Sequence, residues 1–380
     1  MAVMLDLDRE IQKVLAVKET DFPLISFYLD TRVSDKTGYE KKKVLLKHKL
    51  NNKVLLFRNE NKKYQSIVKD AEKIRFYVEN QIKEKTEGVA IFACSHENVF
   101  CDFQFALPFE DQIIVNGYPH IKPLLEIQHD TQKIIAVMVD SRSARIFDIA
   151  CGALKLEERI EDYVPSRLKS GGCSQLRFQH HVEDHILRHL KHVIAFLEDL
   201  FMKENEKIAG IILSGQSEIL ATLKKELPKQ LKQRIIAEES FDIRKQSDKV
   251  LTLILADLRK RENLREKDLI TNIRTKSLST DLGAAGLSET VEALNNKRPF
   301  VMVMDKNLKA EGFICGECGK VFIYRAIACP YCSSEKIKVE KDLPERILRE
   351  AQKEKVKIHL MSSSKELEGI GGIGALLKYK

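Results

Sequence analysis

Short runs of alternating hydrophobic and polar residues mark the first third of the chain, a pattern typical of half-buried β-strands. Such strands are expected at residues 24–30, 88–95 and 99–109. Residues 41–87 repeat their hydrophobic positions at helical spacing and are heavily basic, whereas the two prolines of residues 118–130 favour a connector. The pattern predicts an N-terminal α/β domain over residues 1–130.

The middle third opens with a hairpin pattern and then alternates strands with helices. The hairpin strands are expected at residues 133–140 and 144–150, a buried strand at 208–215, and helices from 174 onward, at 217–233 and at 248–263. The basic, polar residues 264–281 favour a boundary near residue 275. We therefore predict an α/β middle domain over residues 131–275.

The last third shows the same alternation of elements. Helices are expected at residues 288–296 and 344–355, and strands at 299–305 and 356–362. This predicts a third domain over residues 276–380. The whole chain is thus expected to be an α/β protein of three domains.

Composition narrows the class of protein. Of the 380 residues 43% are hydrophobic, and 64 Lys and Arg stand against 56 Asp and Glu, a net charge of +8. This content is sufficient for buried cores, and the mild positive excess favours a polyanionic partner. No run approaches the roughly 18 apolar residues of a membrane helix, and the N-terminus lacks the apolar segment of a signal peptide. We expect a cytoplasmic protein with no membrane partner.

Four of the eight cysteines follow the pattern C-x2-C-x10-C-x2-C: Cys315, Cys318, Cys329 and Cys332. Each C-x-x-C turn brings two thiolates to one ion, and two such turns complete a tetrahedral Zn²⁺ site. In a cytosolic chain this grouping indicates a metal rather than disulfides. Because protein ligands fill all four positions, we predict a structural zinc ion in a ribbon over residues 313–334.

Gly369, Gly371 and Gly374 satisfy the G-x-G-x-x-G pattern of dinucleotide-binding proteins. That fold requires a strand before the glycines, a helix after them and an acidic residue about 20 positions further on. The sequence ends at Lys380, too soon for such a unit. The glycines are therefore interpreted as a turn that leads into a final strand, ALLKY.

Residues 170–178, SGGCSQLRF, place a glycine pair before a long amphipathic helix. Glycines let the backbone approach a ligand closely, and a helix that begins near Ser174 would direct free amides at an anion there. A buried stripe of this helix is predicted from five residues at helical spacing: Val182, Ile186, Leu190, Val193 and Leu197.

A second face of the same helix is basic. It carries Arg177, His181, His185 and His189 at intervals of four residues, and Arg167 and Lys169 add positive charge before the glycines. Three interpretations of the histidines are open: a metal site, a solvated polar face and an edge that faces nucleic acid. No carboxylate completes a metal motif, so we favour the RNA-facing edge.

The glycine-pair loop resembles the G-G-Q-S-x-x-R-F loop of archaeo-eukaryotic class-I peptide-chain release factors. The matching residues are Gly171, Gly172, Ser174, Arg177 and Phe178. Residues 371–379 are similar to the end of that family's third domain, and the cysteine turns resemble those of its archaeal members. The chain is thus similar to a divergent bacterial or archaeal branch of the release factor/Pelota superfamily, in which Balon-type hibernation factors are included.

The resemblance implies a ribonuclease-H-like middle domain and a C-terminal ribosomal-protein-like α/β sandwich with a zinc-ribbon insertion. It implies a factor that occupies the ribosomal A site, with its loop near rRNA and peptidyl-tRNA, a translational GTPase as partner and a monomeric state off the ribosome. Two departures matter: Cys173 stands where the family has glutamine, and no N-I-K-S motif for stop codons is present. We expect ribosome rescue or hibernation without stop-codon reading.

Two alternatives stay open. The first is hydrolysis of peptidyl-tRNA, in which Gly171 and Gly172 give backbone access and Cys173 or Gln175 supplies hydrogen bonds. A thiol is a weak donor, so a backbone amide would have to stabilise the developing charge, unless Cys173 were itself a nucleophile beside a base. The second is a zinc-ribbon RNA-binding protein or nuclease outside translation, with Asp140 and Asp148 as candidate carboxylates.

Overall fold

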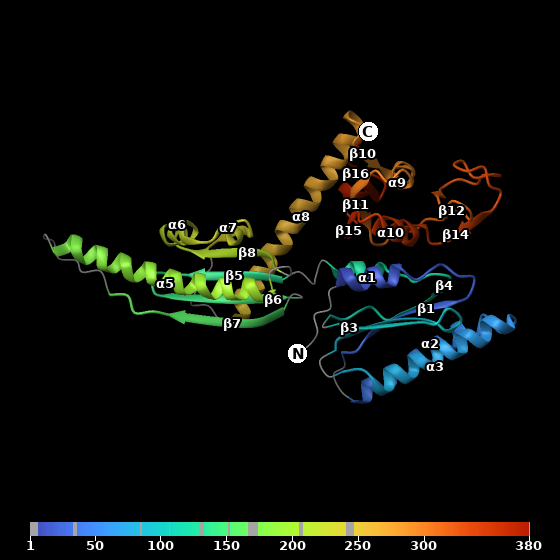
Figure 1. The fold of residues 1–380 in the computed structure, drawn as a ribbon, viewed down its shortest axis with the longest axis horizontal. Helices are drawn as coiled ribbons and strands as arrows, with labels where there is room; N and C mark the ends of the chain where they lie inside the picture. Colours follow the sequence, from blue (N-terminus) through green and yellow to red (C-terminus); the bar gives the residue numbers. More distant parts are fainter. Residues whose placement is uncertain are drawn as a thin grey trace. The chain divides into compact units, whose positions relative to one another are not determined.

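The computed structural model describes residues 7–32, 36–83, 86–105, 107–128, 133–150, 153–165, 174–204, 208–240 and 247–379. These residues form a mixed α/β structure with four sheets (Figure 1). The chain divides into two compact units, one of Met1–Gln128 with Leu264–Lys380 and the other of His129–Asn263. The division into three domains stays a prediction. Within the described ranges, no helix is long and apolar enough to cross a membrane.

The N-terminal part of the first unit is an antiparallel sheet of order β3-β2-β1-β4. Its strands are β1 (Leu24–Asp30), β2 (Gly88–Cys94), β3 (Val99–Phe105) and β4 (Gln112–Asn116), with a 3-10 turn η1 (Ser95–Glu97). Side chains of β1 alternate between two cores. Phe27 packs with α2 (Lys36–Leu55) and α3 (Asn61–Asn80), and Tyr28 with α1 (Leu7–Leu15) and α4 (Lys122–Gln128).

The C-terminal part of the first unit is a mixed sheet of order β10-β16-β11-β15. Its strands are β10 (Gly283–Ala285), β11 (Pro299–Asp305), β15 (Lys357–Met361) and β16 (Ile373–Leu377). Alternate residues of β11 again separate two cores. Met302 packs with α9 (Gly286–Asn295) and α10 (Leu343–Lys353), and Val303 packs with α11 (Lys365–Glu368) and the second half of α8 (Ser247–Ser279).

A small sheet of order β13-β12-β14 projects from this part and carries the cysteine cluster. Its strands are β12 (Gly312–Cys315), β13 (Val321–Phe322) and β14 (Ile337–Glu340). Ile314 and Val321 belong to the same core as α9 and α10. The ribbon is thus joined to the C-terminal sheet by hydrophobic packing as well as by the chain.

The N-terminal and C-terminal sheets of the first unit share one hydrophobic core. It contains Leu7 and Ile11 of α1, Leu124 of α4 and Ile347 of α10, each at most 6% exposed. The first and last segments of the chain therefore fold together, although they are more than 200 residues apart in sequence.

Buried polar groups strengthen this contact. The carboxyl group of Glu345, which is fully buried, accepts hydrogen bonds from the backbone N–H of Ile121 at 2.6 Å and of Lys122 at 3.2 Å. It thereby caps the N-terminus of α4 from α10. The Nδ1 atom of His120 lies 3.3 Å from the same carboxyl group. We call Tyr118, His120, Glu345, Arg346 and Arg349 the buried clamp.

The two arginines of the buried clamp hold the segment before α4. Arg349 donates to the carbonyl oxygen of Pro119 at 2.6 Å, and Arg346 pairs with Glu19 at 2.9 Å. Both guanidinium groups lie over the ring of Tyr118, at 4.3 Å for Arg346 and 4.9 Å for Arg349. Each arginine is 2% exposed, so α10 buries a face that its sequence would assign to solvent.

The second unit is a five-stranded sheet of order β7-β6-β5-β8-β9. Its strands are β5 (Lys133–Val139), β6 (Ser143–Ala150), β7 (Ala153–Glu161), β8 (Ile208–Gly215) and β9 (Ile235–Glu239). β5, β6 and β7 are antiparallel, and β8 and β9 run parallel to β5. Val137 packs with α5 (Ser174–Glu204), α6 (Ser217–Glu226) and α7 (Lys229–Lys232), and Ala136 with the first half of α8.

Three segments differ from the sequence prediction. Residues 118–130, expected as a connector, contain α4, because Pro123 lies in its first turn, where a missing N–H costs little. Residues 264–281, expected as a boundary, mostly continue α8, which buries Ile270 and Ile273 there. The helix expected over 217–233 is divided between α6 and α7 at Pro228.

Candidate RNA-facing site and metal centre

The tip of the glycine-pair loop falls outside the residues that the structure describes. This applies to five predicted site residues: Arg167, Lys169, Gly171, Gly172 and Cys173. Gln175 and Arg177 belong to the first turns of α5, but their side chains also lie outside the described part. Their roles stay predictions. The described segments on either side, residues 162–165 and 180–192, are called the loop stems.

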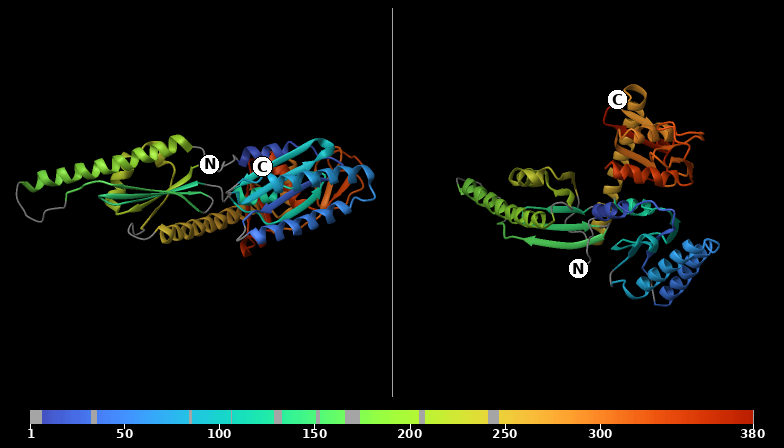
Figure 2. Two further views of the ribbon diagram at one scale, coloured as in Figure 1. Left: turned by 90° about the horizontal axis from the view of Figure 1, so that it is seen from below. Right: turned by 45° about the vertical axis from the view of Figure 1, so that its right-hand side comes forward.

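The N-terminal turns of α5 extend past the sheet of the second unit, as Figures 1 and 2 show. The buried stripe is confirmed, with Ile186 half-buried and four residues buried: Val182, Leu190, Val193 and Leu197. Glu183 lies seven residues before Leu190 and therefore on the same side of the helix, yet its side chain is 71% exposed. The first turns of the helix thus lie beyond the sheet.

Asp162 ties one loop stem to the other. Its carboxylate accepts hydrogen bonds from Nδ1 of His189 at 2.7 Å and from Nδ1 of His192 at 3.0 Å, and its backbone N–H donates to the carbonyl oxygen of Arg142 at 2.9 Å. Burial opposes ionisation of this carboxyl group, but the hydrogen bonds from both histidines outweigh it and lower the pKa of Asp162. These contacts determine where the chain leaves β7.

The structure corrects the assignment of His189 to the RNA-facing edge. Its side chain is 0% exposed, so the ring offers no surface to RNA. On α5 it lies next to the buried Leu190, and Asp162 of the opposite stem contacts its ring at 2.7 Å. The interval of four residues grouped His189 with His181 and His185. The sequence pattern did not show that Asp162 would pack against His189.

Replacement of Asp162 by alanine is expected to lower the free energy of unfolding by about 2 kcal/mol. The substitution leaves a buried N–H of His189 without an acceptor, which costs about 1–3 kcal/mol. A urea titration followed by circular dichroism measures the change. Asp199→Ala is the matched control, since Asp199 is on the exposed surface of the same helix and pairs with Lys203. Equal stability of the two variants would show that the Asp162 contact contributes little.

His181 and His185 do lie on the outer side of α5, exposed and half-buried respectively. Their rings stack in parallel, with centroids 4.6 Å apart and planes at 6°. Tyr163 of the other stem meets His185 edge-on at 6.2 Å. Pattern analysis missed Tyr163 and Asp162. One feature of the sequence could have indicated them: an acidic and an aromatic residue stand together between an amphipathic strand and the glycine pair. The contact of the two histidines with RNA stays a prediction.

The described residues do not support a metal site on these histidines. Apart from the four cysteines, they contain no group of three or more His, Cys, Asp or Glu whose ligand atoms could share an ion. Asp140 and Asp148 do not form a nuclease pair either. Asp148 lies opposite Ile135 and pairs with Lys133 at 2.7 Å, whereas Asp140 is beyond the other end of β5 and accepts from the N–H of Arg142.

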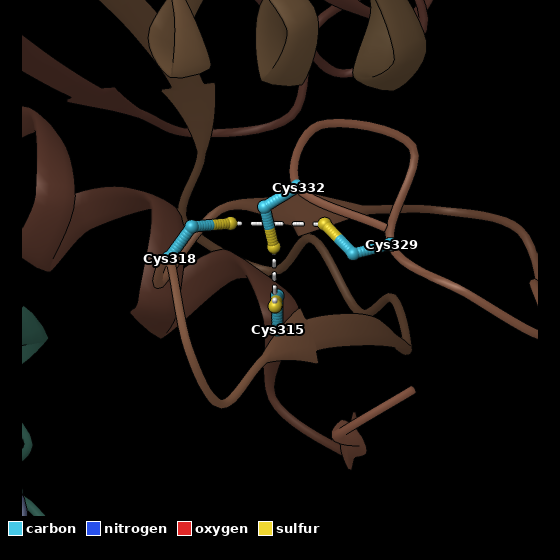
Figure 3. Close-up of side chains that lie close together, drawn as sticks. All are labelled: Cys315, Cys318, Cys329 and Cys332. Carbon is cyan, nitrogen blue, oxygen red and sulfur yellow. Dashed lines mark hydrogen bonds between the residues drawn. The ribbon is translucent and has the colours of Figure 1, made fainter. Parts of the chain in front are cut away.

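The four predicted zinc ligands come together in the ribbon (Figure 3). Their sulfur atoms all lie within 4.8 Å of one another, with 3.5 Å between Cys315 and Cys332 and 3.7 Å between Cys318 and Cys329. A tetrahedral site with Zn–S bonds of about 2.3 Å separates its sulfurs by about 3.8 Å. These distances are too long for disulfides and fit a shared ion. The four cysteines can therefore bind a metal.

The two C-x-x-C turns have the same backbone geometry. In each, the first cysteine accepts from the N–H four residues later, Gly319 to Cys315 at 3.0 Å and Ser333 to Cys329 at 2.9 Å. Gly319 and Ser333 have φ values of +69° and +60° at these equivalent positions. Glycine adopts that conformation at little cost. The N–H of Tyr331 also donates to Sγ of Cys329 at 3.4 Å, which orients the sulfur toward the cluster.

The glycine motif near the C-terminus is a turn, as expected. Gly369 follows α11, Gly371 and Gly372 have φ values of +78° and +75°, and β16 begins at Ile373. The strand comes two residues earlier than the segment ALLKY. It lies between β10 and β11 in the C-terminal sheet, so the glycines serve the fold.

Comparison with known proteins finds similarity to one family of translation factors over the middle of the chain. Residues 119–259 match the family model of bacterial archaeo-eukaryotic release factor family 10. This range contains the whole second unit except its last residues, with both loop stems and the glycine pair. The match covers less than half of the chain and supports membership of the archaeo-eukaryotic release factor/Pelota superfamily. No curated protein matches the chain.

Three solved structures illustrate the similarity. An archaeal translation termination factor is 12% identical, with 98% of this chain and 97% of that chain covered and a TM-score of 0.26. Pelota from Archaeoglobus fulgidus is 16% identical, with 77% and 79% covered and a TM-score of 0.30. A ribosome-bound archaeal Pelota is 11% identical, with 98% and 94% covered and a TM-score of 0.40.

Proposed function

We propose that this protein is a ribosome-binding translation factor that acts in ribosome rescue or hibernation without reading a stop codon. It occupies the A site and places residues 170–178 near the peptidyl transferase centre. The supporting observation is the release-factor family match, which spans the glycine pair and both loop stems. A helix whose first turns extend beyond the sheet suits entry into a narrow site lined by RNA.

The fold supports further parts of the proposal. The mixed five-stranded sheet with helices on both faces supports a ribonuclease-H-like fold for the second unit. The C-terminal sheet with its ribbon is the part we assign to contact with a translational GTPase. For the four cysteines, zinc is the metal that we propose, because Zn²⁺ favours tetrahedral thiolate ligands.

The position on the ribosome is tested by cryo-electron microscopy of ribosomes incubated with the full chain at low salt. Density for the chain in the A site, with residues 170–178 toward the peptidyl transferase centre, is the expected result. An A site that stays empty would overturn the proposal. A peptide-release assay on stalled ribosomes, with Gly172→Ala beside the wild type, then separates hibernation from rescue by hydrolysis.

The logarithm of the ribosome-binding constant is expected to fall linearly with the logarithm of the salt concentration, because lysine and arginine displace ions from phosphates. Arg188→Ala and Lys191→Ala on the exposed side of α5 should each reduce that slope by about one. Co-sedimentation across a potassium chloride series measures it. Lys203→Ala, near the far end of the same helix, is the matched control. Slopes equal to that of the control would remove α5 from the RNA contact.

A further inference from the structure

We infer that Tyr163, backed by the stacked rings of His185 and His181, is a binding site for one unpaired nucleobase of an RNA strand. The inference rests on the proposed function. It adds ring stacking on a base to the binding of phosphates by basic residues. We call these three residues the ring platform. Unpaired RNA bases are commonly held by stacking on tyrosine, histidine and other aromatic side chains.

The ring platform spans both loop stems. Tyr163 comes from the stem after β7, and the two histidines come from α5. The planes of Tyr163 and His185 are at 89° with centroids 6.2 Å apart, whereas His185 and His181 are parallel at 4.6 Å. An edge-to-face contact of this kind covers at most one face of the tyrosine ring, so at least one face remains open for stacking. Its side chain is 81% exposed, more than any other aromatic residue among the exposed hydrophobic side chains of the described ranges.

Contacts on both sides hold the backbone of Tyr163 in place. Asp162 before it accepts from two histidines of α5 and donates to Arg142, and Val164 after it is 4% exposed. The tyrosine thus points outward from a segment that is anchored at either neighbour. A ring held in this way loses little conformational entropy when a ligand stacks on it, which favours binding.

The charges around the ring platform suit a nucleotide. His181, His185, Arg188 and His192 recur at helical spacing on the outer side of α5, and no acidic residue shares those positions. Arg188 can reach a phosphate next to the stacked base. Three acids are nearby. Asp184 is exposed one turn before Arg188, at the edge of this side of the helix. Glu183 lies toward the opposite side of the helix and approaches His180 at 3.6 Å, while Asp162 is bound by its two histidines. An acidic peptide could use the same cations but would gain little from an open ring face.

The test measures binding of the full-length protein to a fluorescent 12-nucleotide adenosine strand by anisotropy across a salt series. Tyr163→Ala is expected to weaken binding about 5- to 150-fold, the range for one stacked base, with the salt slope unchanged. Tyr163→Phe should bind like the wild type, because stacking needs the ring and not the hydroxyl group. Tyr324→Ala is the control, since Tyr324 is also exposed but lies on the ribbon.

Each other outcome overturns the inference. Wild-type affinity in Tyr163→Ala excludes stacking there, and an altered salt slope indicates a phosphate contact instead. Weaker ribosome binding with unchanged affinity for the strand indicates a protein partner. The proposed function is judged separately by wild-type binding to ribosomes. If the wild type binds ribosomes and Tyr163→Ala binds the RNA strand as tightly as the wild type, only the ring platform is rejected. If the wild type does not bind ribosomes but Tyr163→Ala weakens binding of the strand, only the ribosomal role is rejected.

Discussion

Cys315→Ser is expected to abolish zinc binding and to unfold the ribbon over residues 312–340. Cys315 is 1% exposed and ends β12, so its sulfur lies at the inner side of the cluster. The ribbon has only three short strands and a core of few hydrophobic residues. Structural zinc sites contribute on the order of 10 kcal/mol to the folding of such small units. A serine hydroxyl does not replace a thiolate as a zinc ligand.

The effect should extend beyond the ribbon. Ile314 and Val321 pack in the core with α9 and α10, so a loosened ribbon exposes part of that core. Metal content by mass spectrometry should fall from one ion per chain to none, and limited proteolysis should cut within 312–340. Cys101→Ser is the matched control, because Cys101 lies half-buried on β3, away from the cluster. A Cys315→Ser protein that keeps its metal and resists protease would refute the zinc proposal.

Local patterns in the sequence were sufficient for most elements. The strands at 24–30, 208–215 and 299–305 begin and end at the predicted residues, because each alternation is bounded by turn residues. The cysteine spacing likewise identified the ligand cluster, because a C-x-x-C turn is a local structure. By contrast, β4, β7 and β9 were missed, because these strands are short or amphipathic and charged.

Contacts between distant segments could not be predicted. The sequence of α10 has the amphipathic pattern of a surface helix, with its charged residues on the side expected to face solvent. The pattern within this helix does not indicate that Glu345, Arg346 and Arg349 are buried. Their partners, Tyr118 to Lys122, were expected in a different domain. The same limitation applied to His189, which its partner Asp162 holds from the other loop stem. Burial of a charged residue depends on the segment that covers it, and a periodic pattern within one helix does not identify that segment.

Glu345→Ala is expected to destabilise the first unit by about 3 kcal/mol. The substitution leaves the buried N–H groups of Ile121 and Lys122 without an acceptor, and each such group costs about 1–3 kcal/mol. Glu345→Gln keeps the acceptor for the shorter hydrogen bond, from Ile121, and gives up only the longer one from Lys122, so it should lose less at pH 7. Thermal and urea unfolding measure the difference. Glu350→Ala is the control on the same helix, since Glu350 is nearer the surface and pairs with Lys353.

The same pair of variants predicts a distinct dependence on pH. Burial raises the pKa of Glu345 to about 8, although the N–H groups of Ile121 and Lys122 oppose this, and burial lowers the pKa of His120 to about 4. At pH 7 the clamp thus holds a protonated carboxyl group, with Nδ1 of a neutral imidazole ring 3.3 Å away. Glutamine imitates this neutral state with its amide group.

Stability should therefore fall in the wild type as pH rises from 7 to 9. Below about pH 4.5 the carboxyl group of Glu345 is protonated in both the folded and the unfolded protein, and its contribution to the free energy of unfolding is complete. Above that pH only the folded protein keeps the proton, so the contribution decreases as pH rises and is lost once pH passes about 8. His120 has the opposite effect on stability, which it increases as pH rises from about 4 to 6.5, because in this range the unfolded protein binds one more proton than the folded protein. In the window from pH 7 to 9 the wild type should thus lose stability relative to Glu345→Gln. Parallel curves for the two proteins would mean that Glu345 is already ionised at neutral pH, held by Arg349 and the N-terminus of α4.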